Sequence, residues 1–182
     1  MLQLRPHPDS RCAAAVRIEV EVARPRADRL LLSYVVSGKV SDIRLPPVAA
    51  ATRTDGLWQH TCFEAFVRAA SGPSYYEFNF APSTQWAACR FDGYRSGMVA
   101  AEINAPAIEV RSGPDRTTLQ TSLELARLPD LSREASWQLG LSAVIEHASG
   151  GMSYWALAHP PGKPDFHHAD CFALEFSPAV PS

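Results

Sequence analysis

The sequence predicts an all-β fold, an antiparallel, jelly-roll-like β-sandwich of about ten strands. Short segments that alternate between apolar and polar residues recur along the chain, and Gly, Pro, Ser and Asp separate them. Helical periodicity is scarce, with short helical turns expected only at 46–51 and 125–133. Many strands without intervening helices favour a sandwich over a parallel sheet. The 182 residues suit a single domain spanning 1–182.

Each strand is predicted from its own pattern. Residues 16–22 alternate strictly between apolar and charged side chains, as in a half-buried strand, whereas 30–36 form the continuous apolar run of an interior strand. Residues 137–145 and 152–158 flank Ser149-Gly150-Gly151, which predicts a hairpin. The other predicted strands are 62–67, 75–80, 85–91, 108–110, 117–125 and 171–176.

Composition and charge narrow the possible partners. The net charge is −2, from 17 basic and 19 acidic residues, so no basic field is expected for nucleic acid or an anionic membrane. No apolar run approaches the ~20 residues that span a bilayer, and Pro6, Pro8 and Asp9 interrupt a signal-peptide core. We therefore expect a cytoplasmic protein with no nucleic acid or membrane partner. The sequence leaves the oligomeric state open.

The four cysteines fit the same compartment. They form no CxxC pair and no zinc-knuckle spacing, and a reducing compartment keeps such residues as thiols. We expect all four to be unpaired: Cys12, Cys62, Cys89 and Cys171. The last three should be small residues on strands.

The most informative segment is 57–94, which contains three consecutive predicted strands rich in aromatic residues. Side chains alternate between the two faces of a strand, so a parity can be assigned to each. One face should form a core layer of Phe63, Ala65, Val67, Tyr76, Phe78, Phe80, Ala87, Cys89 and Phe91. The opposite face should present Glu64, Phe66, Tyr75, Glu77, Asn79, Trp86, Ala88 and Arg90.

This second face has two interpretations. It is either the floor of a ligand cleft, with Trp86 and Trp58 stacking on a ring, or a solvated surface on which a glutamate pairs with Arg90 for ~0–1 kcal/mol. Glu64 and Glu77 also suggest a glycoside hydrolase, because hydrolysis of a glycosidic bond needs two carboxyl groups about 5–10 Å apart across a sugar. Neighbouring strands instead place the two glutamates where they would share an arginine, so we do not favour hydrolysis.

A second group of polar residues lies at 159–170, HPPGKPDFHHAD, just before the last predicted strand. Imidazole and carboxylate groups are ligands for zinc and similar metals. His167 and His168 would point to opposite faces of an extended chain, so a rigid loop is the favoured interpretation. In a third interpretation this loop overhangs the cleft, and His159, Lys163, Asp165 and His167 contact a ligand without metal.

The motifs LWQ at 57–59, CFEAF at 62–66, YYEFN at 75–79 and PSTQWAACRF at 82–91 resemble those of DOMON-like domains. They are also similar to the family-nine carbohydrate-binding modules of the same superfamily, and most closely to small stand-alone bacterial DOMON-like proteins. The resemblance implies a jelly-roll-like β-sandwich with a ligand cleft on one sheet, and sugars or haem as ligands. His60 and Thr61 stand where sugar-binding relatives often carry acidic residues.

Three functions follow from these observations. We expect a non-catalytic protein that binds a carbohydrate or a sugar-derived metabolite through Trp58, Glu64, Tyr75, Glu77, Asn79, Trp86, Arg90, His159, Lys163, Asp165 and His167. The first alternative is a b-type haem protein that uses Met98 with His159, His167 or Lys163. The second alternative is a metal-dependent enzyme that uses His159, His167 and Asp165. The sequence identifies no cofactor.

Overall fold

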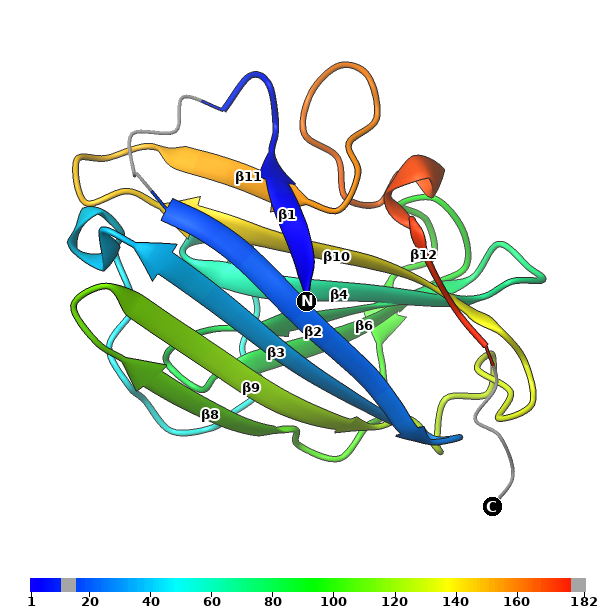
Figure 1. Ribbon diagram of the computed structural model, residues 1–182. Helices are drawn as coiled ribbons and strands as arrows, with labels where there is room; N and C mark the ends of the chain where they lie inside the picture. Colours follow the sequence, from blue (N-terminus) through cyan, green and yellow to red (C-terminus); the bar gives the residue numbers. More distant parts are fainter. Residues whose placement is uncertain (11–15, 178–182) are drawn as a thin grey trace.

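The computed structural model describes residues 1–10 and 16–177, which form two antiparallel sheets with twelve strands (Figure 1). The first sheet contains β2 (Val16–Arg26), β3 (Arg29–Gly38), β9 (Arg116–Glu124) and β8 (Ala107–Ser112), in that order. The second sheet contains β7 (Val99–Ala100), β6 (Trp86–Phe91), β5 (Tyr75–Phe80), β4 (Cys62–Ala69), β10 (Trp137–Glu146) and β11 (Met152–Ala156). A short strand, β12 (Leu174–Phe176), pairs with the start of β10.

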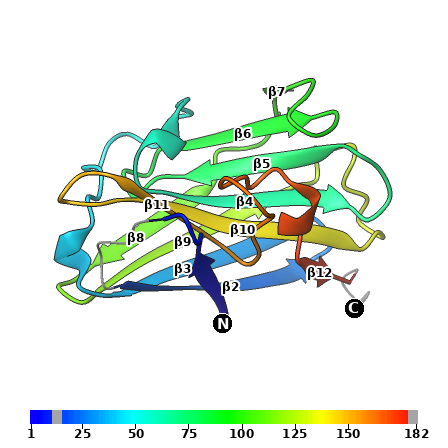
Figure 2. The ribbon, with the colours of Figure 1, turned by 90° about the horizontal axis from the view of Figure 1, so that it is seen from above.

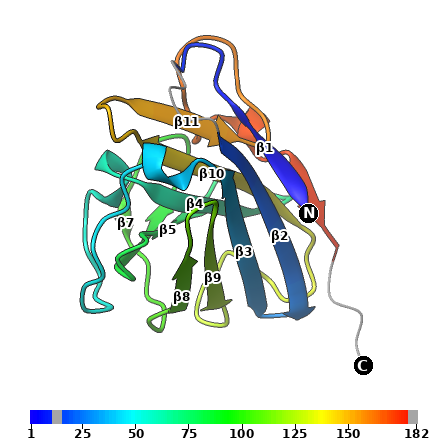
Figure 3. The same cartoon turned by 60° about the vertical axis from the view of Figure 1, so that its left-hand side comes forward.

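The first strand joins the two sheets. β1 (Leu2–Pro6) pairs with β2 through Leu2, Gln3 and Leu4, and with β11 through its last two residues. Figure 3 shows β1 beside both neighbours. The two sheets are therefore one curled antiparallel surface, and the prediction of an all-β antiparallel sandwich is confirmed.

The predicted elements differ from the observed ones at a few places. β1 and β7 were not predicted, which raises the strand count from about ten to twelve. Residues 125–133 contain two hydrogen-bonded turns that meet at Leu128, next to Pro129, as expected, whereas 46–51 form no turn. Short 3-10 turns occur at η1 (Val40–Asp42), η2 (Leu57–Gln59) and η3 (Ala169–Cys171). The last of these turns occupies the start of the strand expected at 171–176. No helix in the described ranges is long and apolar enough to cross a membrane.

The main core lies between the two sheets and contains side chains from both. Its largest fully buried members include Tyr34 of β3, Phe63 of β4 and Phe78 of β5. The Tyr34 hydroxyl donates a hydrogen bond of 2.7 Å to the backbone carbonyl of Glu64, which satisfies a buried polar group and ties the sheets together. Phe63 and Phe78 belong to the predicted core layer of 57–94, and this part of the prediction is correct.

The predicted parity of β6 is wrong. Phe80 pairs directly with Trp86, because five residues, 81–85, connect the two strands. With an odd number of connecting residues, even-numbered residues of β5 share a face with even-numbered residues of β6. Trp86 and Ala88 therefore lie in the main core, and Arg90 has the same parity. The three residues assigned to that core lie on the other face of the sheet: Ala87, Cys89 and Phe91.

The other face of the second sheet carries a smaller apolar cluster. Phe66, Tyr75 and Phe91 on the strands pack against Phe166 and Phe172 from the segment that follows β11. Figure 2 shows this segment crossing above β4 and β10. The second sheet thus has the sandwich core on one face and a covering loop on the other, and the candidate site lies beneath that loop.

The described cysteines are free thiols: Cys62, Cys89 and Cys171. Cys62 and Cys89 are strand residues as predicted, whereas Cys171 ends η3. Cys12 lies outside the described residues.

Candidate functional site

A pocket of about 790 Å³ opens on the outer face of the second sheet, beneath the segment 163–167. Its volume lies in the range of ordinary small-molecule sites. Strands β4, β5, β6, β10 and β11 form the floor, and the segments 55–58, 95–98 and 163–167 form the rim. The lining residues are Asp55, Gly56, Trp58, Glu64, Phe66, Glu77, Asn79, Ala87, Cys89, Phe91, Arg95, Met98, Val144, Tyr154, Lys163, Pro164, Phe166 and His167.

The polar part of the floor consists of two carboxyl groups and an amide. Glu64 and Asn79 are direct cross-strand partners on β4 and β5, and Glu77 is two residues from Asn79 on the same face. The Asn79 amide donates to Glu77 Oε1 at 2.7 Å, and the Ser142 hydroxyl on β10 donates to Glu64 Oε2 at 3.2 Å. Both glutamates are buried, with exposed fractions of 3% for Glu64 and 9% for Glu77.

Burial makes these carboxyl groups hard to ionise. Removal from water raises the pKa of Glu64 to about 8, and the neighbouring Glu77 adds to the rise, while the bond from Ser142 opposes it. Burial also raises the pKa of Glu77, against the opposing effects of the Asn79 amide and of Arg95. At neutral pH, Glu64 therefore carries a proton for most of the time.

His167 reaches the floor from the covering loop and is neutral. Burial, followed by the charge of Arg95, lowers the pKa of His167 to about 4. The Tyr75 hydroxyl accepts a hydrogen bond from the backbone N–H of Arg95 at 3.2 Å, so its proton is free to be donated to His167 Nδ1 at 2.7 Å. The remaining proton of the imidazole is then on Nε2, which lies 3.8 Å from Glu77 Oε2.

Ion pairing fixes the covering loop to the turn between β6 and β7. Asp165 Oδ1 lies 2.8 Å from Arg95 Nη2, and the Tyr94 hydroxyl donates to the other carboxylate oxygen. Asp165 also accepts from the backbone N–H of His167 at 3.1 Å. Arg95 has a φ of 50°, in the left-handed region, which points to a tightly constrained turn. The two rim segments are therefore held together on one side of the pocket.

Aromatic and apolar side chains form the walls. Phe66, Phe91 and Phe166 are buried around the floor, whereas Trp58 and Met98 project from the rim with exposed fractions of 55% and 65%. An exposed tryptophan beside a cavity offers a flat apolar face to a ring. The pocket thus combines a stacking surface at its mouth with hydrogen-bonding groups at its base.

Eight of the predicted site residues lie at or beside this pocket. Trp58, Glu64, Glu77, Asn79, Lys163 and His167 line it, and Tyr75 and Asp165 hold lining residues in place. The structure does not bring the other three into the pocket: Trp86, Arg90 and His159.

Trp86 does not line the pocket, because its side chain lies on the core face of β6. Its side chain is buried in the main core, where the guanidinium carbon of Arg53 lies 4.6 Å from the ring centroid. Its indole nitrogen is buried without a hydrogen-bond partner in the described structure. The expected stacking role therefore does not belong to Trp86, because its ring cannot reach the pocket face.

Arg90 has the same parity and is engaged in ion pairs at the end of the sheet. Its Nε lies 2.6 Å from Asp130 Oδ2, and a second bond reaches Asp92. The Tyr76 hydroxyl donates to the same Asp130 oxygen at 2.7 Å, and burial together with this contact raises the pKa of Tyr76 to about 12. Arg90 thus pairs with aspartates and not with Glu64 or Glu77.

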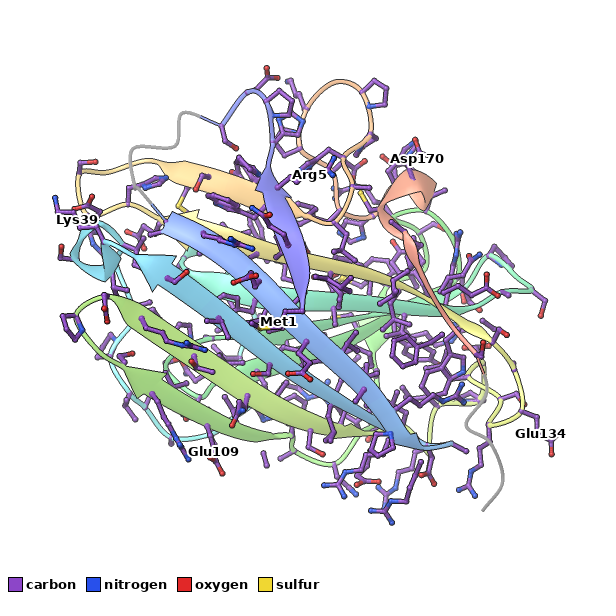
Figure 4. The ribbon with its side chains drawn as sticks, viewed as in Figure 1. Met1, Arg5, Lys39, Glu109, Glu134 and Asp170 are labelled. Carbon is purple, nitrogen blue, oxygen red and sulfur yellow. The ribbon has the colours of Figure 1, made fainter. Side chains whose placement is uncertain are left out.

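His159 anchors the start of the loop. Its Nε2 donates to the backbone carbonyl of Arg5 at 2.8 Å, and its ring packs edge-on against His7 at 4.9 Å between centroids. Figure 4 labels Arg5 on β1, close to this loop, and Asp170 on η3. The backbone N–H of Asp170 in turn donates to His168 Nδ1 at 3.3 Å, which caps that 3-10 turn.

The histidine loop supplies no metal-ligand cluster. Within residues 1–10 and 16–177, no three His, Cys, Asp or Glu side chains are grouped so as to hold a metal ion. Met98, Lys163 and His167 do line the same pocket, but His167 Nδ1 is engaged with Tyr75. Neither the metal-dependent enzyme nor the haem protein gains support from this arrangement.

Sequence reasoning missed several lining residues. Phe91 and Cys89 were assigned to the core through the parity error. Val144 lies on β10, whose pairing with β4 the pattern did not reveal, and Tyr154 lies opposite it on β11. Arg95 lies in a DGYRSG turn, where an aromatic and a basic residue between glycines is the available signal.

Comparison with solved structures finds other proteins that share this fold. A "putative carbohydrate-binding protein" from Bacteroides uniformis superposes with a TM-score of 0.69 at 13% identity, over 93% of this chain and 82% of that one. A family-nine carbohydrate-binding module from Caldicellulosiruptor kristjanssonii, in complex with glucose, superposes with a TM-score of 0.50 at 10% identity, over 88% of this chain and 76% of that one. No protein-family model and no curated protein matches the sequence. The chain therefore shares its fold with proteins described as carbohydrate-binding.

Proposed function

We propose that this protein binds a carbohydrate, non-catalytically, in the pocket between the outer face of the second sheet and the 163–167 segment. The observation that carries the proposal is the pocket itself, in which exposed Trp58 at the mouth stands over Glu64, Glu77 and Asn79 at the base. Aromatic faces stack on the apolar faces of sugar rings, and buried polar groups fix the orientation of hydroxyls.

The fold comparisons support the same ligand class. Both neighbours are described as carbohydrate-binding, and one is in complex with glucose. The resemblance of 57–91 to DOMON-like domains is consistent with this proposal, and we propose membership in that superfamily together with it. Lys163, Asp165, Tyr75 and His167 contribute by shaping and holding the loop side of the pocket.

Isothermal titration against a panel of neutral mono- and disaccharides tests the proposal. Trp58→Ala should weaken the binding of every sugar that binds by about tenfold or more, because it removes a stacking face from the mouth. Trp86→Phe is the matched control: this tryptophan faces the core, so the change should lower stability and leave affinity within about twofold. Silence across the panel, or equal affinity for the wild type and Trp58→Ala, contradicts the proposal.

A further inference from the structure

We propose that the pocket prefers an amino sugar, with a protonated amine placed between Glu64 and Glu77, over the matching neutral sugar. This inference rests on the proposed carbohydrate function and narrows its ligand class. Three observations carry it: two buried carboxyl groups at the base, the lack of a cation paired with them, and aromatic walls around them.

The two carboxyl groups have unused hydrogen-bonding capacity that faces the pocket. In the described structure Glu64 accepts one side-chain bond, at Oε2 from Ser142, and Glu77 accepts one, at Oε1 from Asn79. The other oxygen of each accepts no hydrogen bond from the described residues, and both residues are buried and line the cavity. A ligand in the cavity that supplies hydrogen-bond donors can therefore bond to these two oxygens.

No positive charge in the described residues forms an ion pair with either group. Among the described residues, the basic side-chain nitrogen within 4.0 Å of a Glu77 carboxyl oxygen is that of His167, at 3.8 Å, and this imidazole is neutral. An ammonium group supplies up to three donors and a charge, which makes its bonds to carboxylates about twice as strong as neutral ones. A sugar hydroxyl in the same place supplies one uncharged donor.

Arg95 on the rim disfavours a cation at the base, because its charge lowers the pKa of His167, and its partner Asp165 offsets part of this effect. Arg95 is paired with Asp165 at 2.8 Å. Lys163 is exposed to solvent on the covering loop, and the exposed Asp55 lines the same pocket. Aromatic rings also attract cations, and Phe66 and Phe91 lie beside the glutamates.

Ligand binding would then move a proton. Burial keeps Glu64 protonated at pH 6, because its pKa is about 8, whereas an ammonium ligand stabilises the ionised carboxylate. Binding of the amine should therefore release a proton from Glu64 to the buffer. Binding of a neutral sugar should leave the proton in place. The titratable groups that interact with Glu64 are Glu77 on β5, Tyr34 on β3 and Cys62 on β4, and its neutral polar neighbours are Asn79 and Ser142.

The test is calorimetric titration at pH 6 with glucosamine, galactosamine and mannosamine against glucose, galactose and mannose. The N-acetyl forms serve as uncharged controls, and cyclohexylamine serves as an amine without sugar hydroxyls. The best amino sugar should bind about tenfold tighter than its neutral and N-acetyl counterparts and than cyclohexylamine. Its apparent enthalpy should change with the ionisation enthalpy of the buffer, which reports proton release.

Two variants connect this preference to the floor. Glu64→Gln keeps the shape and removes the ionisable group, so the preference for the amino sugar over its neutral counterpart and the proton release should both disappear. Glu124→Gln, at a half-buried position on β9 in the other sheet, should change neither. If Glu64→Gln folds poorly, the same titrations can be made with Glu77→Gln, which should also weaken the preference for the amino sugar.

The outcomes separate the two proposals. Neutral sugars that bind as tightly as amino sugars overturn the amine preference and leave the carbohydrate function standing. An amine preference that persists in Glu64→Gln also overturns it, as does cyclohexylamine binding as tightly as the amino sugar. If no sugar of any kind binds, both proposals fail together.

Discussion

Gly140→Ala should lower the free energy of unfolding by about 2–3 kcal/mol, because β10 has no room for a side chain at this position. A β-carbon at Gly140 would lie 2.9 Å from the backbone carbonyl oxygen of Cys171 and 3.5 Å from the β-carbon of Phe66. The first contact is with backbone in η3, which cannot rotate away as a flexible side chain would. Urea titration of the wild type and the variant measures the loss.

The same substitution should also weaken sugar binding. Gly140 lies on the pocket face of the sheet, opposite Phe66 on β4, and the 3-10 turn that it supports ends the loop containing Phe166 and His167. Lifting η3 from the sheet to relieve the contact moves that loop away from the floor. We therefore expect Gly140→Ala to lose affinity as well as stability, whereas a change that merely fills a gap would raise stability.

Gly113→Ala is the matched control. Its β-carbon would lie 3.6 Å from the nearest atom, the carbonyl oxygen of Arg116, at an ordinary contact distance, and its φ lies outside the left-handed region. Such a change should alter stability by less than about 1 kcal/mol. Equal effects of the two alanine variants would contradict the explanation by close backbone approach.

Much of the fold could be predicted because alternation is a local signal. A strand such as 16–22 exposes one face and buries the other, so its pattern predicts both its existence and its orientation. β1 shows the limit of this signal: Leu2 and Leu4 alternate correctly, but five residues are too few to stand out from the surrounding sequence. β7 has two residues and gives no pattern at all.

The site was only partly predictable because it depends on register between strands. Glu64, Glu77 and Asn79 share a face since the β4–β5 pairing matches odd with even positions, which the sequence suggested. The β5–β6 pairing matches even with even, and this depends on the connection 81–85, where Thr84 adopts a φ of 75°. A β-branched residue in the left-handed region is unusual, so the loop geometry that sets this register was not apparent from composition.

The rim depends on tertiary contacts that no local pattern encodes. Asp165 and Arg95 are 70 residues apart in the chain and meet because the loop after β11 folds back over the sheet. The sequence showed a polar loop and a glycine-rich turn, but not that one pairs with the other. Of the loop residues expected to contact a ligand, Lys163 and His167 line the pocket and His159 does not, and their contact with a ligand stays a prediction.

Glu64 should make the protein less stable as the pH rises from 6.5 to 8. Its pKa in the folded protein is about 8 against an ordinary value of 4.5, so between these values the folded state binds a proton that the unfolded chain has released. The contribution of Glu64 to the free energy of unfolding is fully present below pH 4.5 and is lost as the pH rises through 8. We expect a fall on the order of 2 kcal/mol between pH 6.5 and 8, measured by urea titration at each pH.

His167 changes the stability in the opposite direction and over a lower range of pH. Its pKa is about 4 in the folded protein against an ordinary value of 6.5, so its contribution to stability is lost as the pH falls from 6.5 towards 4. The two groups offset each other below pH 6.5. Above pH 6.5 the His167 contribution fades as the unfolded imidazole loses its remaining protons. Burial also raises the pKa of Glu77, which therefore acts in the same direction as Glu64.

Glu64→Gln should remove most of the decline above pH 6.5 and make the protein more stable than the wild type at pH 8. Glu124→Gln, with its exposed carboxylate paired to Arg29, should retain the wild-type slope. A wild-type curve that is flat from pH 6.5 to 8, or a decline of equal size in Glu64→Gln, would show that Glu64 is not the group responsible. Glutamine would occupy the same space without this loss of stability. We therefore infer that position 64 carries a carboxyl group because ligand binding needs it, and not because the fold does.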